Sequence, residues 1–349
     1  MENLSEKFEK YEGLFIKLKR PAYIVSSQLI SDYKSIPEKM NSEEFFKKYG
    51  VGNAKIGIDR PLERMEAYEL LLDLLVTIDE KINKIIHKGT PYYFLGWLAF
   101  QLRDFSKAMF YMDAAVNEDL KFPDIKNKKS TTPALEFFLL SLKLDKKPSG
   151  VSDHSNLIEI VKETLQKYNT NDRRDDSNIS IITIENFRSK FVENFLYSDP
   201  KQRTLLTALY TFLLEYTEKE KQIKLRSDTG GTIQPFINHL FDGARLLESL
   251  IEVKGGKRDT LKPKIDSTPK LVVTKEVLLG RKILADARKQ YIELSSAKFQ
   301  DQNFACAYII RNTTGHSLLW DDHFDKDTYK ILYNSLVNSI FWTIDKLWL

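Results

Sequence analysis

The chain has 349 residues, of which 42% are hydrophobic and 12% aromatic, so it can fill more than one core and is neither disordered nor collagen-like. Its formal net charge of +4 is too small to distinguish a nucleic-acid-binding protein from other classes. Because only 14 glycines and 11 prolines are present, few positions are suited to turns, and we predict an all-α fold.

Cys306 is the single cysteine, which excludes an intrachain disulfide framework and a multi-cysteine zinc site. It lies in an apolar run and is expected to be a buried thiol. The charged N-terminus lacks the apolar segment of a signal peptide, and no stretch of about 18 residues is free of charge. We therefore expect a soluble, cytoplasmic protein with no membrane association.

Residues 1–150 are patterned as helices. Short amphipathic patterns precede Pro61, which starts a long predicted helix that Gly89 ends. Two further helices follow, and their small residues recur at intervals of twelve and then seven positions: Gly96, Ala108 and Ala115.

This spacing resembles a tetratricopeptide repeat (TPR), in which small residues allow two antiparallel helices to approach closely. The position three residues after the glycine is usually aromatic in such repeats, and here it is Ala99. The resemblance implies a TPR-like recognition region over residues 1–150 that binds a protein partner or an activator. An unrelated helical hairpin is the alternative.

Residues 151–229 are predicted to form a helical connector. Two polar stretches rich in turn-forming residues mark a domain boundary near its start, and helical patterns follow them. Only the stretches 180–184 and 271–273 are patterned like strands.

Residues 230–349 are predicted to form an up-and-down bundle of four helices, beginning near Pro235, Val277, Asp301 and Asp325. His239 lies on the apolar face of the first helix and is expected to be a core or interface residue. The closing helix offers a broad apolar face for a homodimer, formed by Tyr333, Ile340, Phe341, Trp342 and Trp348.

The segment 252–270 concentrates basic charge, with six basic and three acidic residues among two glycines and two prolines. Two interpretations stay open. The segment is a solvated loop, or it is a mobile loop whose basic side chains neutralise RNA phosphates without reading the sequence. In the second case the RNA-binding residues are Lys254, Lys257, Arg258, Lys262 and Lys264.

Arg311 and Asn312 precede His316 at the break between the last two predicted helices. On a continuous helix a five-residue offset would rotate His316 by about 140° from Arg311. Gly315 can end the helix and turn the chain, which would bring both side chains to one concavity.

This Arg-Asn-x-x-x-His motif, placed between the third and closing helices of a small bundle, resembles HEPN-domain ribonucleases. The resemblance covers about residues 230–349. It implies a metal-independent endoribonuclease without a cofactor, in which two domains pair so that two motifs face each other; a homodimer would supply the second copy. It also implies a role in prokaryotic antiviral defence or as a toxin.

Cleavage of RNA by its own 2′-hydroxyl needs a proton acceptor, a proton donor and positive charge at the phosphate. The catalytic residues would then be His316, which moves protons, and Arg311, which holds the scissile phosphate. Asn312 either supports them or caps the turn. The alternative for Arg311 and His316 is a capped helix end with a structural histidine.

No metal or cofactor site is expected elsewhere. The chain has no P-loop, nucleophile elbow or HExxH helix, and Asp321-Asp322-His323 is interpreted as a solvated loop because adjacent side chains diverge. Two other functions remain open: a non-enzymatic adaptor with a dimerisation bundle, and a nucleotide-binding regulatory HEPN protein.

Overall fold

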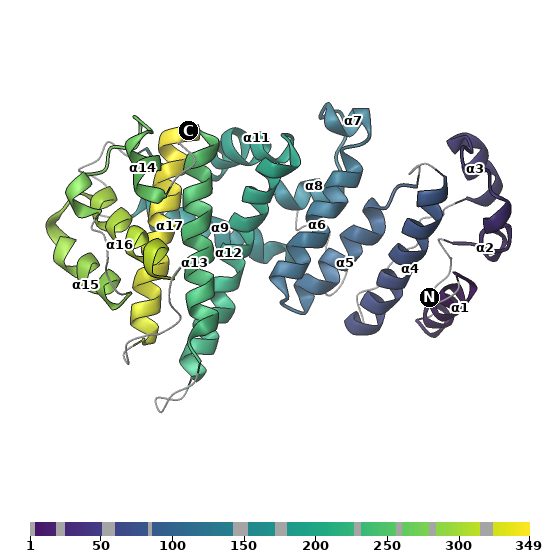
Figure 1. The fold of residues 1–349 in the computed structure, drawn as a ribbon, viewed down its shortest axis with the longest axis horizontal. Helices are drawn as coiled ribbons and strands as arrows, with labels where there is room; N and C mark the ends of the chain where they lie inside the picture. The colour runs from purple at the N-terminus through teal and green to yellow at the C-terminus, as the bar shows by residue number, and fades with distance from the viewer. Residues whose placement is uncertain are drawn as a thin grey trace. The chain divides into compact units, whose positions relative to one another are not determined.

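The computed structural model describes residues 4–18, 25–50, 60–82, 86–141, 153–171, 180–226, 232–255, 260–278, 284–314 and 324–349. All regular structure in these ranges is helical, which confirms the all-α class. The chain divides into two compact units, Met1–Phe137 and Phe138–Leu349 (Figure 1). Among the helices described, none combines the length and apolar character needed to cross a membrane.

The first unit is a succession of packed helices, with α1 against α4, α4 against α5, and α5 against α6. Pro61 occupies the first turn of α4, as the sequence predicts. Up to the boundary between the units, the helices are α1 (Leu4–Lys17), α2 (Ser27–Asp32), α3 (Ser42–Tyr49), α4 (Pro61–Lys81), α5 (Gly89–Gln101), α6 (Phe105–Asp119), α7 (Pro123–Lys126) and α8 (Pro133–Phe138), with a 3-10 turn at Tyr33–Ser35.

The small residues of α5 and α6 allow these helices to lie close together. A Cβ atom added at Gly96 would lie 2.8 Å from Cγ of Met112 and 3.1 Å from the carbonyl oxygen of Ala108. Any larger residue at 96 would force the helices apart. The predicted helix pair is therefore present, and its spacing of small residues has a steric cause.

A buried charged cluster ties α4, α5 and α6 together. The Lys88 ammonium, just before α5, pairs with Asp79 of α4, and both residues are buried. The Lys88 backbone N–H donates to Glu118 of α6 at 3.1 Å. The neighbouring Asp119 accepts hydrogen bonds from Thr132 Oγ1 and contacts His87 Nε2 at 3.1 Å. These buried carboxylates all have partners, as stability requires.

The second unit has a layer of helices in the spatial order α12, α13, α17, α16 and α15 (Figure 1). Residues of the predicted connector belong to this unit, and α12 packs directly on α13. The helices are α9 (Asp153–Asn169), α10 (Ile184–Asn186), α11 (Glu193–Leu196), α12 (Pro200–Leu225), α13 (Gln234–Val253), α14 (Leu261–Asp266), α15 (Ala285–Glu293), α16 (Phe299–Thr314) and α17 (Lys326–Trp348), with 3-10 turns at Lys275–Val277 and Leu294–Ser296.

A π-helical turn at Phe187–Val192 joins α10 to α11. The Glu193 N–H reaches the Arg188 carbonyl, five residues back, so the turn holds one residue more than an α-turn. Phe191 and Phe195 both face Trp348 of α17, with ring centroids 5.5 Å apart in each pair.

The apolar face of α17 packs inside the unit. Tyr333, Ile340, Phe341 and Trp342 are at most 5% exposed, and Trp348 is half-buried. These side chains therefore form core, and the expectation that they provide the face of a homodimer is wrong. The reason is that α12, α13 and α16 all pack against α17.

Neither stretch patterned like a strand forms one. In the first, the Ile182 N–H donates to Asn169 Oδ1 at 3.0 Å and its carbonyl accepts from Asn169 Nδ2 at 2.8 Å. Directly after the second, the Thr274 N–H donates to Asp301 Oδ1 at 2.8 Å. Side chains from helices thus satisfy backbone groups that a neighbouring strand would otherwise satisfy.

The segment 252–270 differs from the expected loop. Its first two residues end α13, and Leu261–Asp266 form α14. Leu261 and Ile265, one helical turn apart, are buried, and α14 packs against α13 and α16. This apolar pair anchors the second half of the segment despite its basic composition.

Candidate functional site

Two of the three predicted catalytic residues lie at the end of α16. Arg311 and Asn312 occupy its last turn and are half-buried. His316 lies outside the described residues, as do Lys257 and Arg258 of the predicted RNA-binding set and the Asp321-Asp322-His323 cluster.

The Arg311 guanidinium is held from two sides by α13. Its Nε donates to Glu248 Oε2 at 2.6 Å, and its central carbon lies 5.4 Å from the ring centroid of Phe241. The side chain is 28% exposed. Guanidinium has five N–H donors, and Nε–H is the one this carboxylate uses. The arrangement fixes the group, and its terminal nitrogens make no hydrogen bond with the described residues, so they can donate to an anion.

Glu248 is itself fixed by a second cation. Its Oε1 lies 3.4 Å from Lys264 Nζ, and this ammonium also donates to Glu252 Oε2 at 2.7 Å. Glu248 and Lys264 are 7% and 5% exposed. Lys264 therefore points into the fold, where it neutralises carboxylates. Removing either member of such a buried pair leaves an uncompensated charge.

The other described lysines of the predicted RNA-binding set contact different partners. Lys254 Nζ lies 5.0 Å from the ring centroid of Trp348, and Lys262 Nζ donates to the carbonyl of Leu278 at 3.5 Å. Lys254 is exposed and Lys262 half-buried. Among the three described lysines of this set, only Lys264 is joined to Arg311, through Glu248.

Asn312 adds a polar group beside Arg311. Its side chain is half-buried and makes no hydrogen bond to any part of the chain that is described. Its amide is thus open to either role that the sequence suggests.

Sequence reasoning missed three residues of this site, which lie on one face of α13. Phe241, Arg245 and Glu248 follow one another at helical spacing. The central guanidinium carbon of Arg245 lies 5.6 Å from the Phe241 centroid, so two arginines flank the same ring. Burial raises the pKa of the adjacent Asp242, and the Arg245 charge opposes this rise. Arg245 makes no ion pair with the described residues, and its spacing from Phe241 was the available signal.

His239 is confirmed as a core residue. Its Nε2 lies 2.9 Å from the Phe212 carbonyl oxygen and its Nδ1 lies 2.7 Å from the Tyr329 hydroxyl. A neutral ring satisfies both contacts, since Nε2–H donates and Nδ1 accepts. Burial lowers the pKa of His239 to about 3. This histidine is therefore not available for proton transfer near neutral pH.

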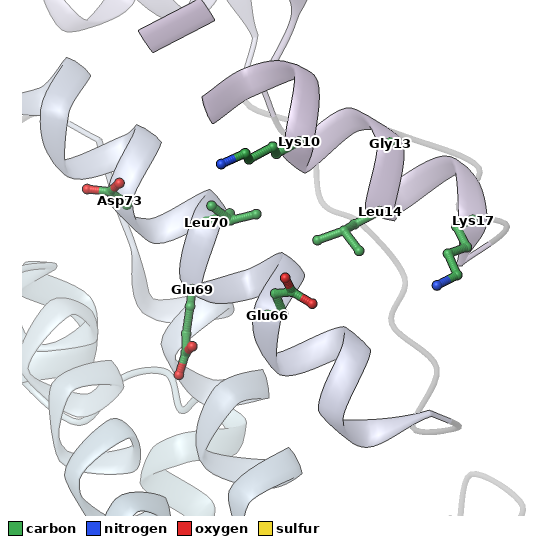
Figure 2. Close-up of a pocket in the computed structure, with 8 residues that line it drawn as sticks. All are labelled: Lys10, Gly13, Leu14, Lys17, Glu66, Glu69, Leu70 and Asp73. Atoms are coloured by element: carbon green, nitrogen blue, oxygen red, sulfur yellow. The ribbon is translucent and has the colours of Figure 1, made fainter. Parts of the chain in front are cut away.

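Three further observations bear on function. Cys306 is fully buried, as expected. Within the described ranges, no group of three or more histidine, cysteine or acidic side chains is arranged to hold a metal ion. A groove of about 690 Å³ lies between α1 and α4 of the first unit (Figure 2).

Comparison with known proteins gives no match for this chain among protein-family models, curated proteins or solved structures. The chemistry of the Arg311 site and of the groove between α1 and α4 is therefore the basis for assigning a function.

Proposed function

We propose that the chain is a HEPN-like, metal-independent endoribonuclease that acts as a homodimer in the cytoplasm, with a TPR-like N-terminal region that binds a partner or activator. The observation that supports it most is the setting of Arg311. Its guanidinium lies between Glu248 and Phe241 in the last turn of α16, immediately before the segment that carries His316. The pair with Glu248 also neutralises a buried carboxylate, and the position of Arg311 just before the His316 segment is what favours a role at the phosphate.

In this proposal the RNA 2′-oxygen attacks the neighbouring phosphorus while the bond from phosphorus to the 5′-oxygen breaks. The His316 imidazole of one copy takes the 2′-hydroxyl proton, and the protonated imidazole of the other copy gives a proton to the leaving 5′-oxygen. Arg311 stabilises the charge on the crowded phosphate, and Asn312 orients the arginine or the phosphate. The products carry 2′,3′-cyclic phosphate and 5′-hydroxyl ends.

The test is cleavage of varied RNAs by the full chain in EDTA. His316→Ala and Arg311→Ala should each lower the rate at least about 100-fold, because proton transfer and phosphate stabilisation each contribute that much. Arg188→Ala is the matched control, since Arg188 is half-buried in the same unit and makes no ion pair with the described residues. DNA should not be cut.

The proposal is contradicted if the wild-type protein does not cleave RNA, or if its cleavage is unchanged by His316→Ala. Light scattering provides a second check, because a strictly monomeric active chain would exclude a site shared between two copies.

Arg245 gives a separate test of RNA binding at this site. Since its charge lies beside Phe241 without an ion pair among the described residues, Arg245→Gln should weaken RNA binding several-fold and reduce the salt dependence by about one ion. Arg188→Gln should change neither quantity. Equal effects of the two substitutions would remove Arg245 from the RNA-binding surface.

A non-enzymatic adaptor is the second candidate. The groove between α1 and α4 favours it, because the groove offers a place for a partner that lies outside the nuclease motif. The same cleavage assay separates the two functions.

A further inference from the structure

The groove between α1 and α4 has walls of opposite charge. Two basic residues line it from α1 and three acidic residues line it from α4, with one leucine on each side (Figure 2). The lining residues are Lys10, Gly13, Leu14, Lys17, Glu66, Glu69, Leu70 and Asp73.

Two of the three carboxylates are already neutralised within the first unit. Asp73 pairs with Lys7 of α1. Glu69 accepts from Lys107 Nζ at 2.8 Å and from the Tyr111 hydroxyl at 3.1 Å, both on α6. Figure 2 shows the Glu69 side chain directed away from α1.

Glu66 is different. It is exposed, it makes no hydrogen bond or ion pair with the described residues, and Figure 2 shows its carboxylate directed towards α1. Leu14 and Leu70, one from each wall, are half-buried and provide apolar surface beside it. On the facing wall, Lys17 pairs with Glu63 at 3.1 Å. The groove therefore presents the Glu66 carboxylate next to apolar surface.

Gly13 keeps one wall of the groove low. Glycine in the interior of a helix is unfavourable relative to alanine, yet Gly13 lies within α1, its φ is not positive, and no atom lies within 4 Å of an added Cβ. Neither backbone conformation nor packing within the described chain requires glycine here. The position is open, so a second molecule can approach the helix backbone here.

We propose that this groove binds a linear segment of a partner protein through an arginine side chain. The aliphatic stem lies over Leu14 and Leu70, and the guanidinium pairs with Glu66. Arginine fits because it combines an apolar stem with a fork of donors that matches a carboxylate. The inference goes beyond the proposed nuclease and does not depend on it.

The test uses the full chain and a fluorescein-labelled heptapeptide, Gly-Ser-Leu-Arg-Leu-Ser-Gly, with anisotropy as the readout at low salt. The same peptide with glutamate in place of arginine should bind at least about tenfold more weakly, as the loss of a charge-assisted hydrogen bond predicts. Glu66→Gln should weaken the arginine peptide by about the same factor. Glu80→Gln, an exposed carboxylate of α4 outside the groove, should leave binding unchanged.

Filling the groove gives an independent arm. Gly13→Leu should abolish binding, whereas Gly13→Ala, which adds one methyl group, should retain it. Because no atom lies within 4 Å of a Cβ added at this position, both variants should keep wild-type helicity. The proposal is overturned if Glu66→Gln has no effect, if the glutamate peptide binds equally well, or if Gly13→Leu still binds. Spermidine binding as tightly as the arginine peptide would also overturn it, because the groove would then select any cation.

Discussion

His239 predicts a pH dependence of stability that one substitution should remove. Burial lowers its pKa in the folded chain to about 3, whereas an unfolded histidine has a pKa of about 6.5. Between these values the unfolded state binds a proton that the folded state does not. Stability is therefore fully present above about pH 6.5 and falls as the pH falls, by about 1.4 kcal/mol per pH unit.

At about pH 5 the loss from this one group is about 2 kcal/mol relative to neutral pH. The hydrogen bond to the Phe212 carbonyl opposes part of this lowering of the pKa, and the Lys219 charge adds to it. Tyr329 and Tyr333 do not titrate in this range. His239→Gln should keep a donor for Phe212 and an acceptor for Tyr329 without titrating in this range.

The measurement is urea denaturation of the wild type and of His239→Gln, followed by circular dichroism near neutral pH and at about pH 5. The variant should be less stable near neutral pH, because it loses the ring contact with Phe212. The difference between the two proteins should shrink by about 2 kcal/mol on acidification, since other titrating groups are shared. A difference that stays constant would mean that the buried ring accepts a proton, and would refute the reasoning.

Three further predictions concern single positions. Gly243→Ala should cost about 1–2 kcal/mol in urea denaturation, because its Cβ would lie 2.5 Å from two ring carbons of Phe212; a neutral result would show that the ring can move. Gly13→Ala should instead stabilise the chain by roughly 0.5–1 kcal/mol in the same assay, and a loss would mean that the added methyl group is not in open space. The Cys306 thiol should not react with a thiol reagent until the chain unfolds, since it is fully buried and burial raises its pKa to about 12; labelling of the native chain within minutes would contradict this.

The sequence predicts structure that depends on local patterns, but not contacts between residues far apart in the chain. The α5–α6 pair and the positions of α13 and α17 follow from local patterns of apolar, small and capping residues. The partner of Arg311 does not, because Glu248 lies 63 residues earlier and no local pattern links the two. The sequence thus predicts that Arg311 and Asn312 lie at the end of a helix, but not the groups that hold Arg311 there.

Side-chain contacts also explain why two other segments differ from their predicted structure. Asn169 bonds both backbone groups of Ile182, so a stretch with the pattern of a strand needs no neighbouring strand. Burial of Leu261 and Ile265 turns a segment with a basic composition into a packed helix. Charge counts describe the surface of such a segment, whereas two apolar residues one turn apart decide whether it packs.

The π-helical turn at Phe187–Val192 makes this stretch tolerant of a change in chain length. Loss of the exposed Ser189 would remove the extra residue and leave an ordinary α-turn, in which Phe187 and Phe191 still lie on one face at a spacing of three. Phe191 and Phe195 would keep their spacing and their contacts with Trp348. A related chain can therefore be one residue shorter here while the register of α11 on α17 is preserved.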